Sequence, residues 1–325
     1  MRFSLISPTF DRPEEVQEFI ISVSKLNYSQ DLFEVILADG TPGDTLRPII
    51  DQESKKCKLS IKVIHEEYLP VSEARNAAAE IAHGEYLIFF DSDCIIPIDY
   101  LNEIDSGLAD SSWEAFGGPD AAPPEFSALQ KAISFSMTSF WTTGGIRGGK
   151  IATSKYYPRG FNMGVKKDIF IKMKGFDTKF KTGEDVELSI RLVEAKYKVG
   201  LIPKAFVFHK RRSTLFSFFK QVRRFGGARW HLSRKHEGQL KLTHIFLVFI
   251  ISFLIISFLF GLNNSVYPLF VGVFYFLFPF VLSGIKSRSL VVGIFSISTT
   301  FVMMLGYSFG FLEALFGRGA HKRRG

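Results

Sequence analysis

The sequence predicts an α/β fold, in which a domain built on a mostly parallel sheet is followed by a C-terminal transmembrane helical region. Strands and helices alternate in the first part of the chain, as they do in parallel sheets covered by helices. From residue 242 to residue 316, Phe, Leu, Ile and Val dominate, and Lys286, Arg288 and Glu313 are the only charged side chains. The length of 325 residues also allows about two domains of ordinary size.

Short apolar runs separated by turn residues set the order of the first elements. We predict strands over residues 3–7, 33–38, 59–64 and 86–90, and helices over residues 13–26 and 71–82. The first helix has proline in its first turn, where proline is favoured. Polar side chains follow the strands at Thr9, Asp39, Asp91 and Asp93. Because ligands bind outside the carboxyl ends of parallel strands, we expect these four residues to share one site.

Asp91-Ser-Asp93 places two carboxylates at the end of a buried apolar strand. Such a pair suits a hard divalent cation, which usually takes one or two carboxylates together with substrate phosphates. A cation held there can neutralise a diphosphate as it leaves. A capped turn after a strand is the simpler interpretation of this motif taken alone.

Two later segments are candidate parts of the same site. Residues 144–149 are rich in glycine and predict either a lid over the substrate or a plain surface loop. Glu184 and Asp185 open a predicted helix that runs to about residue 194. Carboxylates in a first helical turn are stabilised by unpaired N–H groups and the helix dipole. Helix capping is therefore the alternative role of both residues.

Motifs of several other protein classes are missing. No Gly-x-Gly-x-x-Gly follows the first strand and no Walker sequence is present, which argues against a dinucleotide-binding fold. Cys57 and Cys94 give neither a disulfide framework nor a zinc spacing, which fits a reducing compartment. The N-terminus lacks the pattern of a cleavable signal peptide, and we expect its short apolar run to be the first strand.

The apolar tail predicts three transmembrane segments, at about residues 242–260, 266–285 and 290–311. Crossing a bilayer takes about 20 mostly apolar residues, a length that all three segments reach. A buried soluble core is the alternative interpretation.

A basic stretch precedes this tail. Residues 204–241 hold eleven Lys or Arg side chains and one acid, Glu237, and account for most of the net charge of +8. The interleaved aromatic and basic side chains predict an amphipathic helix over residues 214–241, lying in the interface of a membrane with anionic lipids. Nucleic acid is the alternative partner, and the adjoining apolar tail favours the membrane.

These patterns divide the chain into a soluble domain (1–213), the amphipathic helix (214–241), the transmembrane region (242–317) and a basic tail (318–325). Lys and Arg beside a membrane segment mark the cytoplasmic side. We therefore expect a multi-pass protein of the inner (cytoplasmic) membrane with a cytosolic soluble domain. Three crossings place the basic tail outside, against the positive-inside rule. The length of the third segment still leads us to predict three crossings rather than two.

Eight segments of the chain, in this order, are similar to family 2 glycosyltransferases of the GT-A fold, in their membrane-anchored bacterial form. They cover the chain from its start to about residue 230. The matching segments are residues 5–12, 35–40, 73–78, 84–93, 160–163, 175–177, 183–188 and 207–209. The resemblance implies transfer of a sugar from a nucleotide donor with inversion at the anomeric carbon.

The resemblance also implies how the donor is held. Thr9 and Asp39 match positions that bind the nucleoside, where Asp39 can accept a hydrogen bond from a uracil N3–H. Arg75 matches a position near the diphosphate, and Asp91 one that reaches the ribose or a metal-bound water. Many members have two acids before a glycine at this point. This chain has Ala38 in place of the first acid, followed by Asp39 and Gly40.

The metal, the base and the acceptor have matching positions as well. Asp91, Asp93 and His209 match the site of Mg²⁺ or Mn²⁺, although His209 is also interpretable as a surface histidine beside the basic residues 210–212. Asp185 matches the catalytic base, a role worth roughly 10²–10⁴ in rate. The implied acceptor-binding residues are Asn162, Met163 and Glu184.

The acceptor is expected at the membrane. Processive members of the family carry Gln-x-x-Arg-Trp, whereas this chain has Phe225 after Arg224. We therefore predict a non-processive enzyme that uses a UDP-sugar and a polyprenyl phosphate or lipid-linked glycan in cell-surface polysaccharide synthesis. A membrane scaffold that binds a sugar nucleotide without turnover is the alternative. A nucleotidyltransferase is disfavoured because its glycine-rich, lysine-containing phosphate loop is missing.

Overall fold

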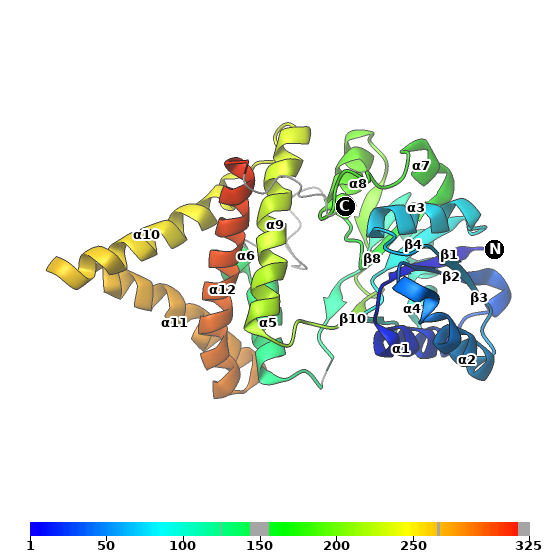
Figure 1. Ribbon diagram of the computed structural model, residues 1–325, viewed down its shortest axis with the longest axis horizontal. Helices are drawn as coiled ribbons and strands as arrows, with labels where there is room; N and C mark the ends of the chain where they lie inside the picture. The colour runs from blue at the N-terminus through cyan, green and yellow to red at the C-terminus, as the bar shows by residue number, and fades with distance from the viewer. Residues whose placement is uncertain (124, 144–155, 265–266, 318–325) are drawn as a thin grey trace. The chain divides into compact units, whose positions relative to one another are not determined.

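The structure is a computed structural model that describes residues 1–123, 125–143, 156–264 and 267–317 (Figure 1). The chain forms two compact units. The first comprises Met1–Pro123 and Ala152–Lys210, and the second comprises Pro124–Ile151 and Arg211–Gly325. The glycine-rich loop at 144–149 and the basic tail at 318–325 lie outside the described residues.

The first unit is built on a seven-stranded sheet in the order β3-β2-β1-β4-β8-β6-β9. The four strands β1 to β4 pair in parallel, which confirms the predicted mostly parallel sheet. β8 runs antiparallel to both β4 and β6, while β6 and β9 are parallel. The strands are β1 (Phe3–Thr9), β2 (Phe33–Asp39), β3 (Ile61–His65), β4 (Tyr86–Phe90), β6 (Ala115–Gly117), β8 (Asn162–Lys166) and β9 (Val199–Leu201).

Helices cover both faces of this sheet, because side chains alternate along each strand. Ile88 and Phe90 of β4 pack with α1 (Pro13–Ser24), α2 (Arg47–Cys57) and α4 (Tyr100–Ser111). Leu87 and Phe89 of the same strand pack on the opposite face. The helices there are α3 (Val71–Ile81), α7 (Lys167–Lys172) and α8 (Glu184–Glu194).

A three-stranded sheet, in the order β5-β10-β7, lies beyond the carboxyl end of β4. Its strands are β5 (Cys94–Ile95), β7 (Asp120–Ala121) and β10 (Val207–His209). His209 is paired with Cys94 in the antiparallel register of β10 and β5. This pairing carries His209 to the residues that follow β4.

The second unit is helical in the described residues. The predicted amphipathic segment is helical as α9 (Leu215–Lys235), and the three apolar segments form α10 (Leu242–Asn264), α11 (Tyr267–Ser287) and α12 (Leu290–Leu315). The unit also contains α5 (Ala128–Thr138) and α6 (Phe140–Thr143), which belong to the first domain in the sequence-based division. Among the residues described, α12 alone is long and apolar enough to cross a membrane, with a mean hydropathy of 1.9, and Val273–Ser287 is a shorter apolar helix.

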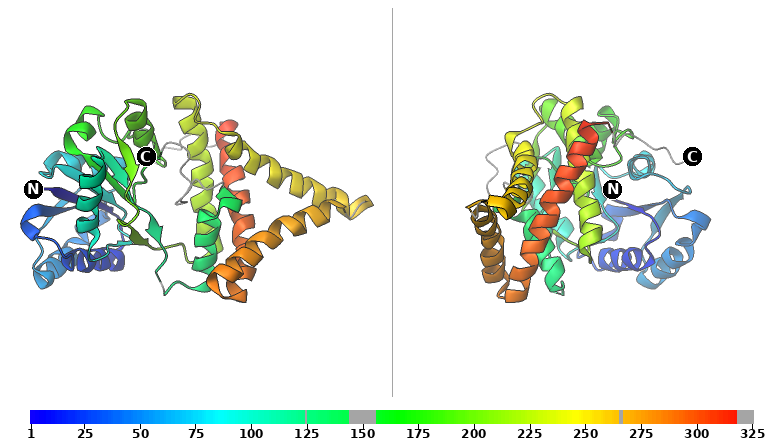
Figure 2. Two further views of the ribbon diagram at one scale, coloured as in Figure 1. Left: turned by 180° about the vertical axis from the view of Figure 1, so that it is seen from behind. Right: turned by 60° about the vertical axis from the view of Figure 1, so that its left-hand side comes forward.

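α9 and α12 lie side by side (Figure 2). Glycine permits their close approach: a Cβ on Gly226 would lie 2.0 Å from the carbonyl oxygen of Tyr307, and one on Gly310 would lie 1.8 Å from that of Arg223. Arg223 also donates two hydrogen bonds of 2.6 Å to Glu313. The contact is therefore specific to these helix faces.

The apolar face of α9 is covered by this packing. Phe218 and Val222 are buried in a cluster with Met303 of α12 and with Ile133 and Met137 of α5. The sequence-based interpretation placed this face in the membrane interface, whereas in the structure it contacts other helices of the same unit. The exposed residues of α9 include basic side chains, namely Lys220, Arg223, Arg224, Arg234 and Lys235.

Candidate functional site

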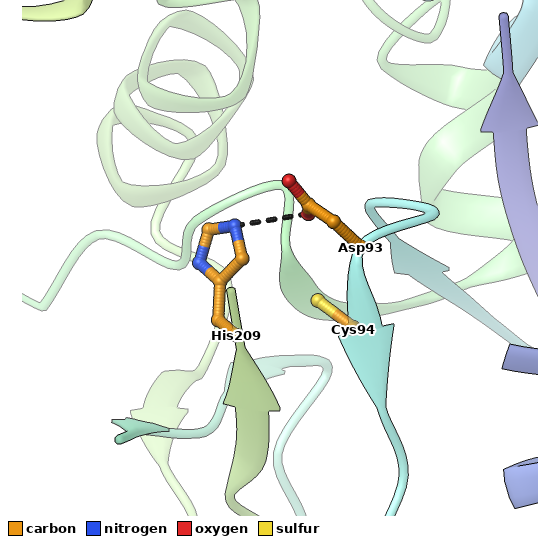
Figure 3. Close-up of side chains that lie close together, drawn as sticks. All are labelled: Asp93, Cys94 and His209. Carbon is orange, nitrogen blue, oxygen red and sulfur yellow. Dashed lines mark ion pairs between the residues drawn. The ribbon is translucent and has the colours of Figure 1, made fainter. Parts of the chain in front are cut away.

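Asp93 and His209 meet at the junction of the two sheets (Figure 3). The Nε2 atom of His209 lies 3.1 Å from Oδ1 of Asp93 and 3.9 Å from Oδ2 of Asp91. The ring of His209 stacks on Phe161, with a centroid distance of 5.1 Å. Three predicted metal-site residues are thus brought together from β10 and from the turn after β4.

Cys94 adds a thiol to this group. Ligand atoms of Asp93, Cys94 and His209 all lie within 4.8 Å of one another. The Cys94 thiol is buried and donates to the carbonyl oxygen of Phe161 at 3.5 Å. Burial raises the pKa of the Cys94 thiol well above its usual value, and the charges of Asp93 and Asp91 raise it further. A protonated thiol is a poor metal ligand, so the two carboxylates and the imidazole are the fitting donors.

These donors suit a divalent cation of the Mg²⁺ or Mn²⁺ type, since carboxylate oxygens are its preferred ligands and imidazole is acceptable to Mn²⁺. The carboxylate of Asp120 lies 4.0 Å from Nδ1 of His209, behind the ring. That distance is too long for a hydrogen bond, and the stacking on Phe161 orients the ring of His209. The donor set therefore fits the predicted cation.

Two cationic side chains border the group. The Nη1 atom of Arg12 lies 3.4 Å from Oδ2 of Asp93. The backbone N–H of Lys210 donates to the carbonyl oxygen of Asp93 at 3.1 Å, and Nζ of Lys210 lies 2.5 Å from Glu18. Both contacts hold the turn after β4 against β10 and α1.

Arg75 of α3 joins two carboxylates that are distant in sequence. Its guanidinium donates to Oδ1 of Asp91 at 2.6 Å and to Oε1 of Glu184 at 2.8 Å. A third, longer hydrogen bond of 3.3 Å reaches the carbonyl oxygen of Gly160. The side chain is 2% exposed, whereas that of Asp91 is 40% exposed. Arg75 thus positions two carboxylates, and the contact with a diphosphate implied by resemblance stays a prediction.

Glu184 and Asp185 open α8, as predicted. The residue before them, Gly183, has φ +87°, a left-handed conformation that favours glycine. Oδ2 of Asp185 accepts a hydrogen bond of 2.8 Å from the N–H of Gly160, so the carboxylate is tied to the loop before β8. Burial raises the pKa of Glu184 to about 7, the charge of Asp185 raises it as well, and Arg75 opposes the shift.

Thr9 and Asp39 face each other across β1 and β2. Asp39 is fully buried, and its Oδ1 accepts hydrogen bonds from the hydroxyl of Thr9 at 3.0 Å and from the hydroxyl and N–H of Thr41 at 2.6 and 3.1 Å. Oδ2 is left for other partners. The two residues implied in nucleoside binding are therefore one hydrogen-bonded unit.

Asn162 and Met163, implied in acceptor binding, lie in the interior. The side-chain oxygen of Asn162 accepts a hydrogen bond of 2.5 Å from Tyr100, and its amide group donates to the carbonyl oxygen of Ala205 at 2.8 Å. Met163 is buried in the core between the sheet and α3. Neither side chain is exposed, and a role in acceptor binding remains a prediction.

Arg12 and Asp120 are site neighbours that the sequence did not single out. Both contacts depend on pairing between elements far apart in the chain. Arg12 ends the matching segment 5–12 but was assigned no role, and Asp120 lies in none of the eight matching segments. The sequence does offer one indication of Asp120. It follows Gly-Gly-Pro at residues 117–119, and glycine and proline mark the end of a strand, where polar site residues are expected.

Known proteins resemble this chain in sequence. Residues 4–110 match the family "Glycosyl transferase family 2" and residues 86–315 match "Glycosyl transferase family group 2". The succinoglycan biosynthesis protein ExoA of Rhizobium meliloti (strain 1021) is 25% identical over 63% of this chain and 62% of its own length. A dolichyl N-acetyl-alpha-D-glucosaminyl phosphate 3-beta-D-2,3-diacetamido-2,3-dideoxy-beta-D-glucuronosyltransferase of Methanococcus voltae is 24% identical over 71% of this chain and 74% of its own length.

Solved structures share the fold. The mannosyltransferase PcManGT from Pyrobaculum calidifontis, in complex with GDP-Man and Mn²⁺, has a TM-score of 0.61 at 14% identity and covers 98% of this chain and 88% of its own. TarS from S. aureus has a TM-score of 0.52 at 16% identity and covers 96% of this chain and 55% of its own. The family match extends over more than half of the chain, and the chain therefore belongs to the family 2 glycosyltransferases and has a GT-A-like fold.

Proposed function

We propose that the protein is an inverting, non-processive and metal-dependent glycosyltransferase that moves a sugar from a UDP-sugar to a membrane-associated acceptor, such as polyprenyl phosphate or a lipid-linked glycan, for cell-surface polysaccharide. The observation that carries this proposal is the grouping of Asp91, Asp93 and His209 beside Arg75, Glu184 and Asp185. The side chains that could bind a cation and the candidate base thus lie on either side of the buried Arg75.

Asp185 is the proposed base. Inversion requires a carboxylate that takes the proton from the acceptor hydroxyl as its oxygen attacks the anomeric carbon from the face opposite the leaving diphosphate. The hydrogen bond from Gly160 and the position at the start of α8 hold this carboxylate in a defined orientation. Glu184 next to it is held by Arg75, which separates the two adjacent acids into different roles.

Asp91, Asp93 and His209 would hold Mg²⁺ or Mn²⁺. When bound, such a cation neutralises the charge that develops on the leaving diphosphate. Phe161 orients the imidazole of His209 by stacking, and Arg12 and Lys210 hold Asp93 in place. The Mn²⁺ and GDP-Man in the solved complex of PcManGT support a metal and a nucleotide sugar for this fold.

Membrane association rests on the second unit. Large apolar side chains on α10 and α11 are exposed, including Phe249, Phe253, Phe274 and Ile285. Exposed apolar surface of this extent marks a protein or membrane contact. α12 alone is both long and apolar enough over its described residues, but α10 and α11, with 23 and 21 residues, also reach the length of about 20 that a crossing takes. We propose that α10 and α11 cross the bilayer as a pair, with the first unit in the cytosol.

α12 is better placed at the membrane surface than across it. Its side chains from Met303 onward pack on α9, which carries Lys220, Arg223 and Arg224. The part before Met303 is about 20 Å long at 1.5 Å per residue, less than the roughly 30 Å of a hydrocarbon core. In addition, 44% of its most apolar window is buried in the protein. Two crossings return the basic tail to the cytosol, in agreement with the positive-inside rule.

A donor and acceptor screen tests the proposal. The purified full-length chain is incubated with radiolabelled UDP- and GDP-sugars and polyprenyl phosphate or a lipid-linked disaccharide, with and without MnCl₂. We expect metal-dependent label in the lipid phase from one UDP-sugar. Label from GDP-sugars only would refute the proposed donor class, and nucleotide-sugar binding without transfer to any lipid would favour a non-catalytic scaffold.

A further inference from the structure

A second group of ligating side chains lies at the ends of β2 and β3. Ligand atoms of Asp39, Asp44 and His65 all lie within 4.8 Å of one another. Nδ1 of His65 is 3.4 Å from Oδ2 of Asp39 and 3.5 Å from Oδ1 of Asp44. None of these residues belongs to the group formed by Asp91, Asp93 and His209.

The facing atoms of this group lack partners for hydrogen bonding. Oδ2 of Asp39, Oδ1 of Asp44 and Nδ1 of His65 are all buried atoms without a hydrogen bond. The Asp39 side chain is 0% exposed, so no bulk water reaches it, and its other oxygen already accepts three hydrogen bonds. Buried polar atoms are rarely left unsatisfied. Three such atoms that converge on one point can therefore act together as ligands of one cation.

The distances match the edge of a tetrahedral metal site. Zn²⁺ binds histidine nitrogen and carboxylate oxygen at about 2.0–2.2 Å in tetrahedral geometry, which places neighbouring ligand atoms about 3.3–3.6 Å apart. The two distances from His65 fall in this interval. The side chains of His65 and Asp44 are 25% and 43% exposed, which leaves a path for the ion and room for water as a fourth ligand.

We propose that Asp39, Asp44 and His65 form a second cation site, selective for a borderline metal such as Zn²⁺, and that the bound ion competes with the donor nucleotide. The imidazole favours Zn²⁺ over Mg²⁺, which prefers oxygen ligands in an octahedral arrangement. The competing effect rests on the proposed function. Oδ2 is the one oxygen of Asp39 not already hydrogen-bonded within the described residues, so a base N3–H and a metal ion require the same atom.

Zn²⁺ binding to the full-length chain is measured by calorimetry in an Asp93→Asn background, which removes the other group. We expect one site, and a rise of roughly tenfold or more in its Kd in His65→Asn and in Asp44→Asn. His83→Asn is the matched control, because His83 also lies 3.5 Å from a carboxylate, Glu34, but accepts from Lys62. The Asp44 side chain is 43% exposed, so Asp44→Asn tests the site even where His65→Asn does not fold.

An unchanged Kd in both variants would overturn the site and leave His65 as an ordinary neighbour of two carboxylates. UDP affinity, measured with otherwise wild-type protein in MgCl₂, provides the second readout. We expect micromolar Zn²⁺ to weaken UDP binding in the wild type and not in His65→Asn. If Zn²⁺ binds at His65 and leaves UDP affinity unchanged, the metal site stands, and the competition and the nucleoside role of Asp39 are refuted. Glycosyl transfer itself is not needed for either measurement.

Discussion

Arg75 donates a hydrogen bond of 2.8 Å to Glu184, the residue directly before the proposed base. The same guanidinium binds Asp91, in the turn that carries the proposed metal ligands. The buried guanidinium of Arg75 therefore connects the proposed donor side of the site with the start of α8, where the acceptor is expected.

Asp185→Asn keeps the shape of the side chain and removes the proton acceptor. We expect kcat to fall by roughly 10²–10⁴ with donor affinity nearly unchanged, because a base acts in the transition state rather than in donor binding. Steady-state kinetics and UDP titration measure the two quantities. Glu194→Gln, at the other end of α8, is the control. Near-normal turnover in Asp185→Asn would leave only a helix-capping role for this residue.

Asp93→Ala removes a carboxylate that faces His209. We expect turnover to be lost and metal-dependent UDP binding to weaken, while the circular dichroism spectrum is retained. Asp110→Ala, at an exposed position on α4, should behave like the wild type in both assays. Full activity in excess EDTA would show that no divalent cation is involved.

Arg75→Met leaves two carboxylates without their buried partner. We expect a loss of roughly 3 kcal/mol in unfolding free energy, at the lower end of the range for a broken buried ion pair, because Asp91 is partly exposed. Chemical denaturation of the full-length protein in detergent measures this loss. Adding Glu184→Gln should restore part of the stability. Arg47→Met removes an exposed ion pair with Asp51 and should cost only a few tenths of a kcal/mol.

Glu184 should make stability depend on pH. Its pKa is raised from 4.5 to about 7 in the folded protein, so the folded state binds the proton more tightly than the unfolded state does. The stabilising contribution is then complete below pH 4.5 and is lost as the pH rises through about 7. We expect the Tm of the wild type to fall more between pH 5 and pH 8 than that of Glu184→Gln. Parallel curves for the two proteins would contradict the raised pKa; Glu80→Gln serves as the exposed control.

A cysteine at Gly325, in a Cys57→Ser background, tests the number of crossings. With α12 at the membrane surface, we expect protection from an impermeant thiol reagent in intact cells and labelling after permeabilisation. A cysteine at Asn264, where α10 ends, should be labelled in intact cells and serves as the control. Labelling of both positions in intact cells would restore the three crossings predicted from the sequence.

Local sequence patterns correctly predicted those elements of the fold that are determined by residues close together in the chain. The run of five buried residues in β4 and the acids after it predicted both the strand and the site. The prediction omitted α2, because its sequence is mostly polar and only Ile50 and Glu53 are buried. The pairing of His209 with Cys94 and the contact of Arg75 with Glu184 join distant segments, and no local pattern encodes them.

The face of α9 shows a different limit of sequence reasoning. Phe218 and Val222 satisfy the pattern of a membrane-bound amphipathic helix, and they equally satisfy packing against another helix. The deciding residues, Gly226 and Gly310, lie in different helices and are informative only once those helices are placed together. The sequence therefore predicts that this face of α9 is covered, and only the structure shows that another helix covers it.

Lys210 lies where the chain leaves the first unit. His209 is followed by a single residue before the second unit begins at Arg211. Lys210 is fastened on both sides, by its backbone to Asp93 and by its ammonium group to Glu18 of α1. Contacts within the first unit, to α1 and to the turn after β4, therefore fix the backbone next to His209. The spacing between His209 and Asp93, two of the proposed metal ligands, is thus set by the same contacts that end the first unit.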